Sequence, residues 1–137
     1  MRTSLRNAFP SILLLWLTFS CTTPSKDESR TTLMGSWYAQ WVTDPASFPE
    51  VTNIESFTMN GKIIFHADSV EINAYGFPGC IFSADTLRHS LKWEVKNDTI
   101  NFLNEDDIYG MSYTIKELKE DIVRLQLMDD IFLTLKK

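Results

Sequence analysis

LKWEVKNDTINF, residues 91–102, decides the fold of this chain. Its apolar residues Leu91, Trp93 and Val95 alternate with charged residues, and a period of two is typical of a strand with one buried face. Asn97-Asp98 then provides a tight turn before a second strand-like stretch. The stretch therefore predicts a β-hairpin, in which two antiparallel strands follow each other directly.

The same alternation continues on both sides of this hairpin, over residues 33–137. Asn60-Gly61 is the strongest short hairpin signal in the chain and predicts a turn between strands at 54–58 and 62–66. No long helix is expected. We predict an all-β domain, a small antiparallel up-and-down barrel of about eight strands, because closure removes the exposed edges of the sheet. The further predicted strands lie at 37–42, 70–75, 110–118, 123–127 and 131–135.

The first 21 residues predict export and lipid anchoring. Arg2 and Arg6 precede a mainly apolar run over residues 9–19, which is shorter than the about 20 apolar residues that a membrane-spanning helix needs. Ser20 followed by Cys21 resembles the cleavage site of bacterial lipoproteins. This resemblance implies that the signal peptide at residues 1–20 is removed and that Cys21 is acylated. The partner it implies is a membrane of the bacterial cell envelope.

Residues 21–32 are expected to form the acylated cysteine and a flexible tether, ahead of a barrel domain at 33–137. Large apolar residues are missing from 22–32, so this segment cannot bury enough surface to offset the entropy lost on ordering. Lys26-Asp27-Glu28 resembles the charged tag that sends some Gram-negative lipoproteins to the outer face of the outer membrane, although an ordinary polar linker explains it equally well. We expect an outer-membrane location, with the membrane face left open.

Cys80 is the other cysteine of the chain. If Cys21 carries lipid, Cys80 has no intramolecular partner, and we expect a small buried side chain rather than a reactive thiol. If the lipoprotein interpretation is wrong, the two cysteines could form a disulfide bond instead.

The charge of the chain argues against nucleic acid as a partner. The chain has 13 basic and 18 acidic residues and a net charge of −5; loss of residues 1–20, with their two basic residues, changes it to −7. Binding of nucleic acid needs clustered Lys and Arg. Direct adsorption to an anionic membrane is disfavoured for the same reason.

Motifs for catalysis or metal binding are missing from the sequence. Neither His66 nor His89 has a serine, cysteine or acid at a diagnostic spacing. The acidic residues at 105–107 and Asp129-Asp130 lack the spacing of a calcium loop and lie where turns are expected. We therefore expect a protein that is not an enzyme and that has no metal and no cofactor.

Leu33-Met34-Gly35-Ser36-Trp37 opens the predicted barrel. A Gly-x-Trp start followed by a meander of about eight strands resembles the lipocalin-like domains of small bacterial lipoproteins, over residues 33–137. The resemblance implies structural roles for both motif residues: Trp37 lies at the closed end of the barrel, and Gly35 lets the chain pass close beneath it. It also implies that a basic side chain covers the indole. The candidates for that side chain are Arg124, Lys136 and Lys137.

Aromatic residues on the predicted strands are the candidates for lining a ligand pocket. Such an interior suits a small apolar or amphipathic ligand. The same side chains could instead fill the barrel, which at about eight strands is just wide enough for side chains. The alternative function is that of a module that binds another envelope protein through loops at 44–53 and 76–88. The six aromatic candidates are Trp41, Phe65, Tyr75, Trp93, Phe102 and Tyr113.

Overall fold

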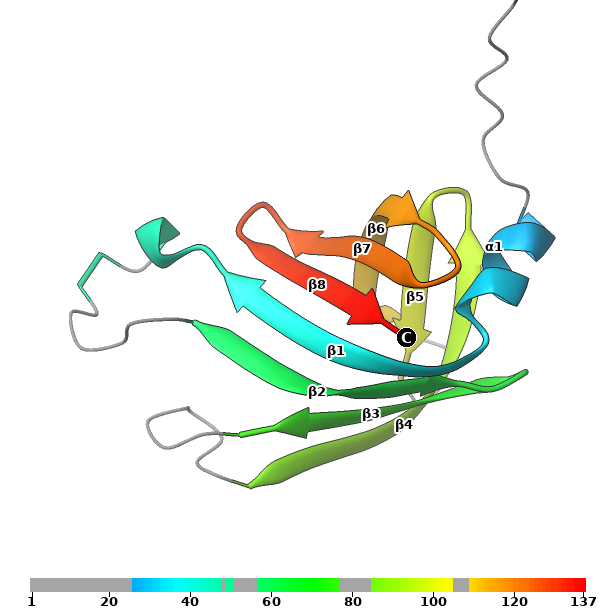
Figure 1. The fold of residues 1–137 in the computed structure, drawn as a ribbon, viewed down its shortest axis with the longest axis horizontal. Helices are drawn as coiled ribbons and strands as arrows, with labels where there is room; N and C mark the ends of the chain where they lie inside the picture. Colours follow the sequence, from blue (N-terminus) through cyan, green and yellow to red (C-terminus); the bar gives the residue numbers. More distant parts are fainter. Residues whose placement is uncertain (1–25, 48, 51–56, 77–84, 105–108) are drawn as a thin grey trace, which may run out of the picture.

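Eight antiparallel strands close into one barrel, in the order in which they occur in the chain (Figure 1). The computed structural model describes residues 26–47, 49–50, 57–76, 85–104 and 109–137. Each strand pairs with the next, and β8 pairs with β1, so the predicted all-β up-and-down barrel is confirmed. The elements are α1 (Lys26–Leu33), β1 (Gly35–Thr43), a short 3₁₀ helix (Pro45–Ser47), β2 (Thr58–Phe65), β3 (Ser69–Tyr75), β4 (Thr86–Lys96), β5 (Thr99–Leu103), β6 (Tyr109–Leu118), β7 (Ile122–Met128) and β8 (Ile131–Lys136).

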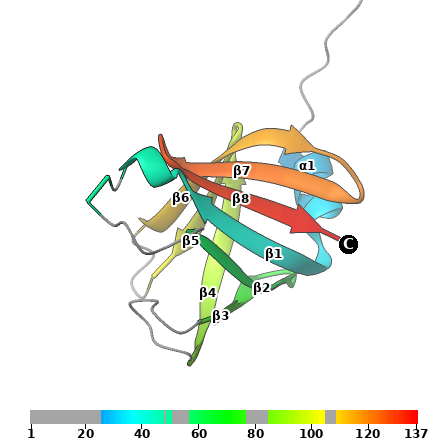
Figure 2. The same cartoon turned by 60° about the vertical axis from the view of Figure 1, so that its left-hand side comes forward.

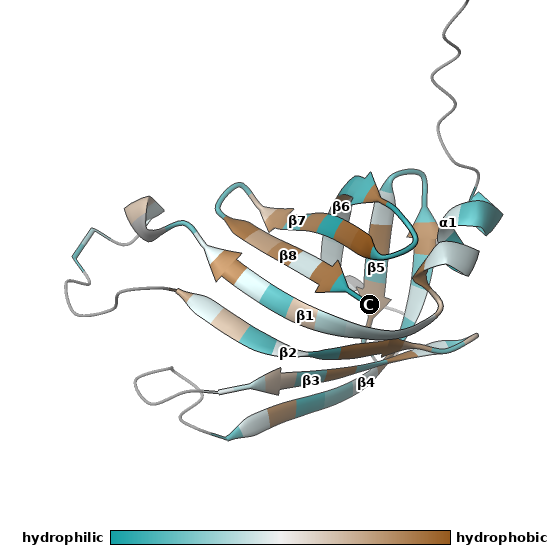
Figure 3. Cartoon of the chain, in the orientation of Figure 1, coloured by the Kyte–Doolittle hydropathy of each residue, from teal (hydrophilic) through white to brown (hydrophobic). Residues whose placement is uncertain are grey.

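Buried and exposed side chains alternate along most of the strands, and Figure 3 shows apolar and polar residues interleaved along several of them. In β3, Val70, Ile72 and Ala74 are buried, whereas Glu71 and Tyr75 are exposed. The same alternation brings apolar side chains of all eight strands into one core. A shift of one residue in the pairing would turn a whole set of these side chains toward solvent, so the core specifies the register of each strand.

Strand β2 passes directly through Asn60-Gly61, so the hairpin predicted there is wrong. Gly61 pairs with Ala39 of β1 and with Ala74 of β3. A Cβ atom on Gly61 would lie 2.3 Å from the carbonyl oxygen of Asn73 and 2.8 Å from Cζ3 of Trp41. Glycine is therefore needed here because an indole ring and the neighbouring backbone come too close for a side chain. Close approach of this kind, like a tight turn, is a common reason for a glycine inside a strand.

Helix α1 packs against one end of the barrel, so the prediction of a flexible tether is wrong for residues 26–32 (Figure 2). Leu33, the last residue of the helix, is completely buried. The guanidinium of Arg30 lies 4.6 Å from the ring centre of Trp93 and donates a hydrogen bond to the carbonyl oxygen of Ala67. These contacts stabilise a helix that is too short and too polar to form by itself.

The predicted signal peptide at 1–20, Cys21 and residues 22–25 lie outside the described part of the chain. Within the described part, the helices lack the length and the apolar character that crossing a bilayer requires.

Trp37 seals the barrel end that lies next to α1, which we call the closed end. The side chain is 1% exposed, and its Nε1 donates a 2.7 Å hydrogen bond to the carbonyl oxygen of Leu33. Lys137 Nζ lies 4.5 Å from the ring centre, so Lys137 is the basic residue that covers the indole. Gly35 joins α1 to β1 with a φ of 101°, a conformation that glycine adopts readily and other residues do not. A Cβ atom on Gly35 would meet no atom within 4 Å, so the predicted close passage of the chain at this glycine is wrong and the backbone conformation is what requires it.

Substitution of Gly61→Ala tests the role assigned to this glycine. We expect a loss of about 1–3 kcal/mol in the free energy of unfolding, because the added methyl group overpacks the space between two strands and Trp41. Chemical denaturation of the purified variant measures the loss. The control is Asn60→Ala at the neighbouring exposed position, which we expect to change stability by less than about 0.5 kcal/mol. Unchanged or increased stability of Gly61→Ala would contradict the close approach.

Candidate functional site

The inside of the barrel has two halves, which differ in how completely their side chains are buried. The turns at 66–68, 97–98 and 119–121 lie at the closed end, beside α1. The opposite end, which we call the far end, is where β1, β3, β5 and β7 leave the barrel. The far half of the interior forms the candidate site, for the reasons given below.

Aromatic side chains fill the closed half. The ring of Phe65 contacts that of Trp93 edge to face, with 4.9 Å between ring centres, and lies 6.1 Å from Phe102. All three side chains are at most 4% exposed. Since side chains around a water-sized cavity would retain accessible surface, these three predicted pocket residues fill the core instead of lining an open space. Trp93 is held further by a 2.9 Å hydrogen bond from its Nε1 to the carbonyl oxygen of His66.

Trp41 and Tyr113 join opposite walls of the barrel through their polar atoms. Nε1 of Trp41, on β1, donates a 3.2 Å hydrogen bond to the hydroxyl oxygen of Tyr113, on β6. The Tyr113 hydroxyl in turn lies 3.8 Å from Sδ of Met111, which accepts its proton weakly. Both aromatic residues are among the predicted pocket residues. They are separated by 72 positions in the chain, and no sequence pattern indicates that they are in contact.

Burial determines the protonation state of this hydroxyl. Tyr113 is 2% exposed, and desolvation raises its pKa above the ordinary value of 10.0, an effect that the hydrogen bond from Trp41 partly opposes. The phenol therefore stays neutral at physiological pH. A neutral phenol can accept one hydrogen bond and donate another, so the pair forms a polar point within apolar surroundings.

Apolar side chains around this polar point are only partly buried. They belong to β1, β4, β6 and β7, have the inward-facing parity of their strands and pack against the buried core. Their incomplete burial leaves part of their apolar surface accessible to solvent, as it does for Ile115 and Leu118 nearer the closed end of β6. A mostly apolar wall with few polar groups is typical of ligand sites, which makes this region the candidate site. The residues are Trp41, Leu91, Met111 and Leu127.

Tyr75 does not belong to this site, and its prediction as a pocket-lining residue is wrong. It follows the buried Ala74 on β3, so its side chain points out of the barrel and is 46% exposed. The alternation of the strand itself requires this direction. Tyr75 instead borders a pocket on the outer surface, which is described below.

Parts of the predicted binding loops lie outside the described residues, namely residues 48 and 51–53 of the loop at 44–53 and residues 77–84 of the loop at 76–88, as do residues 54–56 of the predicted strand at 54–58, Cys80 and the acidic residues 105–107. The roles expected for them therefore stay predictions. The part of the loop region that is described includes the 3₁₀ helix Pro45–Ser47.

The polar residues considered for chemistry are accessible to solvent. His66 is about half exposed, with Nε2 3.1 Å from a carboxylate oxygen of Glu71. His89 is exposed as well, although it pairs with the buried Ile72 and so has the inward-facing parity of β4. Asp129 and Asp130 occupy the turn between β7 and β8, as predicted. Among the described residues, His, Cys, Asp and Glu side chains form no group of three or more that could hold a metal ion.

Substitution of Tyr113→Phe tests the link across the barrel. We expect a loss of about 1 kcal/mol in the free energy of unfolding, because Trp41 Nε1 loses its acceptor in a partly buried place. The control is Tyr38→Phe, since Tyr38 is 74% exposed and the loss of its hydroxyl should change stability by less than about 0.5 kcal/mol. Equal stability of the two variants would contradict the link.

The pKa of Tyr113 predicts a loss of stability at high pH. Burial raises this pKa in the folded state, so Tyr113 ionises at a lower pH in the unfolded chain than in the folded protein. The neutral phenol therefore contributes its full stability below pH 10.0, and this contribution falls as the pH rises above that value. Denaturation curves on both sides of this pH measure the effect. We expect Tyr113→Phe to lose less stability over this interval than the unsubstituted protein; an identical loss would contradict the burial effect.

The fold has a counterpart among solved structures. The chain is similar to a lipocalin-like protein from Bacteroides uniformis, with a TM-score of 0.51 over 77% of this chain and 98% of that chain, at 12% sequence identity. No family model matches the chain, and no curated protein matches its sequence. At so low an identity the likeness concerns the fold alone. The eight-stranded closed barrel thus has a lipocalin-like fold.

Proposed function

We propose that this protein is a lipid-anchored, non-enzymatic protein of the bacterial cell envelope that binds a small apolar or amphipathic molecule in the far half of its barrel. The observation that carries the proposal is the partly buried apolar wall around the Trp41–Tyr113 hydrogen bond. A lipocalin-like barrel can hold one small ligand in its interior.

The contacts inside the barrel limit the kind of ligand. The closed half is filled by Phe65, Trp93 and Phe102, so the ligand is short and occupies the far half alone. The apolar wall favours an aliphatic or aromatic body. The Trp41 N–H and the Tyr113 hydroxyl favour a ligand with a single polar group. This group would bind one of the two residues in place of the hydrogen bond between them. An amphipathic molecule with one hydroxyl or carboxyl group has these properties.

The anchor rests on the first 21 residues and agrees with the position of α1. Only residues 22–25 separate Cys21 from the start of the helix at Lys26. A fully extended chain over this interval spans about 18 Å at most. Acylation of Cys21 therefore keeps the closed end near the membrane and directs the far end, with the ligand site, away from it.

Substitution of Cys21→Ser tests the anchor. In a bacterial host that processes lipoproteins, we expect the unsubstituted protein to sediment with membranes and to carry the mass of its acyl chains on Cys21. The variant should lack this mass and leave the membrane fraction. Cys80→Ser is the control and should retain both properties. A Cys21→Ser variant that stays on the membrane would contradict lipid anchoring.

Displacement of a fluorescent fatty acid from the purified protein tests the ligand site. We expect saturable binding, and we expect Trp41→Ala and Met111→Ala to weaken it about tenfold, a change equal to 1.4 kcal/mol. The control is Phe132→Ala, because Phe132 is 41% exposed and alternates with buried residues of β8, so it points outward. Circular dichroism verifies that the variants fold. Failure to bind any member of a broad panel of apolar and amphipathic molecules would contradict the ligand proposal.

A further inference from the structure

The outer surface of the barrel carries two adjacent rows of side chains that lie side by side across the sheet. Strand pairing defines these rows, because residues opposite each other on neighbouring strands point to the same face. The first row consists of Arg88, Asn73, Lys62, Tyr38 and Lys136, on β4, β3, β2, β1 and β8. The second row, two residues along each strand, consists of Thr86, Tyr75, Asn60, Gln40 and Thr134.

These rows contain three cations and no carboxylate, although acidic residues outnumber basic ones in the whole chain. Lys62 and Lys136 lie directly opposite Tyr38, one on each side. Among the described residues, Arg88, Lys62 and Lys136 form no ion pair. The surface therefore has a local positive charge that no acidic neighbour in the rows cancels.

Two carboxylates near the rows, Glu71 and Glu117, have partners of their own. Glu71, in the adjoining row toward the closed end, lies 3.1 Å from Nε2 of His66. Glu117, on β6 opposite Arg124 of β7, lies with its carboxylate 3.3 Å from Nε of Arg124 and also forms an ion pair with Lys119. Glu117 is thus paired with two cations, whereas the charge of Glu71 is balanced only when His66 is protonated; within the two rows themselves a negatively charged ligand meets cations alone.

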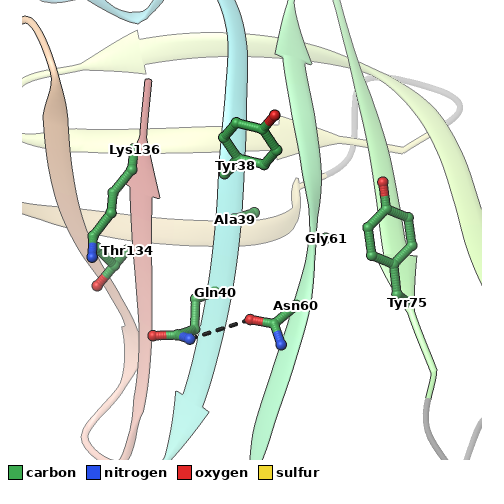
Figure 4. A pocket seen from close by; sticks show the side chains of 8 residues that line it. All are labelled: Tyr38, Ala39, Gln40, Asn60, Gly61, Tyr75, Thr134 and Lys136. Atoms are coloured by element: carbon green, nitrogen blue, oxygen red, sulfur yellow. Dashed lines mark hydrogen bonds between the residues drawn. The ribbon is translucent and has the colours of Figure 1, made fainter.

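A pocket of about 310 Å³ opens within these rows (Figure 4). The backbone at Ala39 and Gly61 forms its floor, because the side chain of Ala39 points inward and Gly61 has none. Figure 4 shows the rings of Tyr38 and Tyr75 on opposite sides of this floor. The two rings are 74% and 46% exposed, and aromatic surface at a pocket rim is available for contact with a ligand.

Amide groups lie beside the rings. Nε2 of Gln40 donates a 3.2 Å hydrogen bond to Oδ1 of Asn60, on the neighbouring strand. This bond orients both side chains and leaves the amide oxygen of Gln40 and the amide nitrogen of Asn60 for other partners. One acceptor and one donor, held on adjacent strands, match a pair of hydroxyl groups on neighbouring carbons of a sugar.

We propose that the two rows bind an acidic oligosaccharide, a chain of pyranose rings that carry carboxylate groups. The apolar C–H face of a pyranose ring packs on Tyr38 or Tyr75, its hydroxyl groups bind the Gln40–Asn60 pair, and its carboxylate binds Lys136 or Lys62. This site is separate from the barrel interior, since its side chains face outward, and it does not depend on the function proposed above.

Titration of the full-length protein with trigalacturonate, followed by calorimetry, tests this proposal. We expect saturable binding that weakens as salt is added, because the lysines are exposed to solvent. The methyl ester of the same trisaccharide has the same rings without the charge and should bind more weakly. Equal binding of the ester, or binding that is indifferent to salt, would overturn the assignment of the lysines.

Substitutions in the rows complete the test. We expect Tyr38→Ala to weaken binding of trigalacturonate about tenfold and the double variant Lys62→Gln, Lys136→Gln to weaken it about fivefold at low salt. The matched charge control is Lys96→Gln, at an exposed position beside the β4–β5 turn, and the interior control is Tyr113→Phe; both should bind like the unsubstituted protein. Tyr38 and Lys136 are exposed, so their variants are expected to fold normally. Absence of binding, or unchanged binding of Tyr38→Ala, would overturn the proposal.

Discussion

The pairing of β1 with β8 is the constraint on which the other features depend. It runs from Tyr38 opposite Lys136 to Thr43 opposite Ile131 and turns a meander with two free edges into a closed surface. Closure creates an inside and an outside, and the alternation of each strand then assigns every side chain to one of them. The sealed core, the apolar wall of the far half and the outer rows with their cations all result from one register around the barrel. A slip by one residue in any strand would exchange its two faces.

Local patterns in the sequence were sufficient for the architecture but not for long-range contacts. The period of two and the turn at Asn97-Asp98 depend on neighbouring residues, so strands and their order could be predicted. Asn60-Gly61 has the same local sequence as a hairpin turn. Its glycine is explained by the indole of Trp41, which packs against it from another strand, and a local pattern does not reveal this contact. Helix α1 was missed for a related reason: its stability comes from burial of Leu33 and from the contact of Arg30 with Trp93, not from its own composition.

The candidate site was predictable in part. Of the aromatic residues, Tyr75 could have been excluded from the interior by the alternation of its own strand, because its neighbour Ala74 is the buried residue. Which of the others fill the core and which remain accessible depends on where strands begin and end, and on packing across the barrel. The hydrogen bond from Trp41 to Tyr113 joins β1 to β6 and has no local signature. The outer rows likewise appear only when five strands are placed side by side.

Helix α1 also determines how the domain bears mechanical force. A pull on the N-terminus reaches β1 through Leu33 and Gly35, and β1 pairs with β2 from Gly35 to Val42 and with β8 from Tyr38 to Thr43. The contacts of α1 with the barrel must also yield before the strand is loaded fully. In a chain held at this end, force therefore reaches the contacts of α1 first and β1 afterwards, and resistance to forced unfolding depends on the rate of unfolding and not on equilibrium stability.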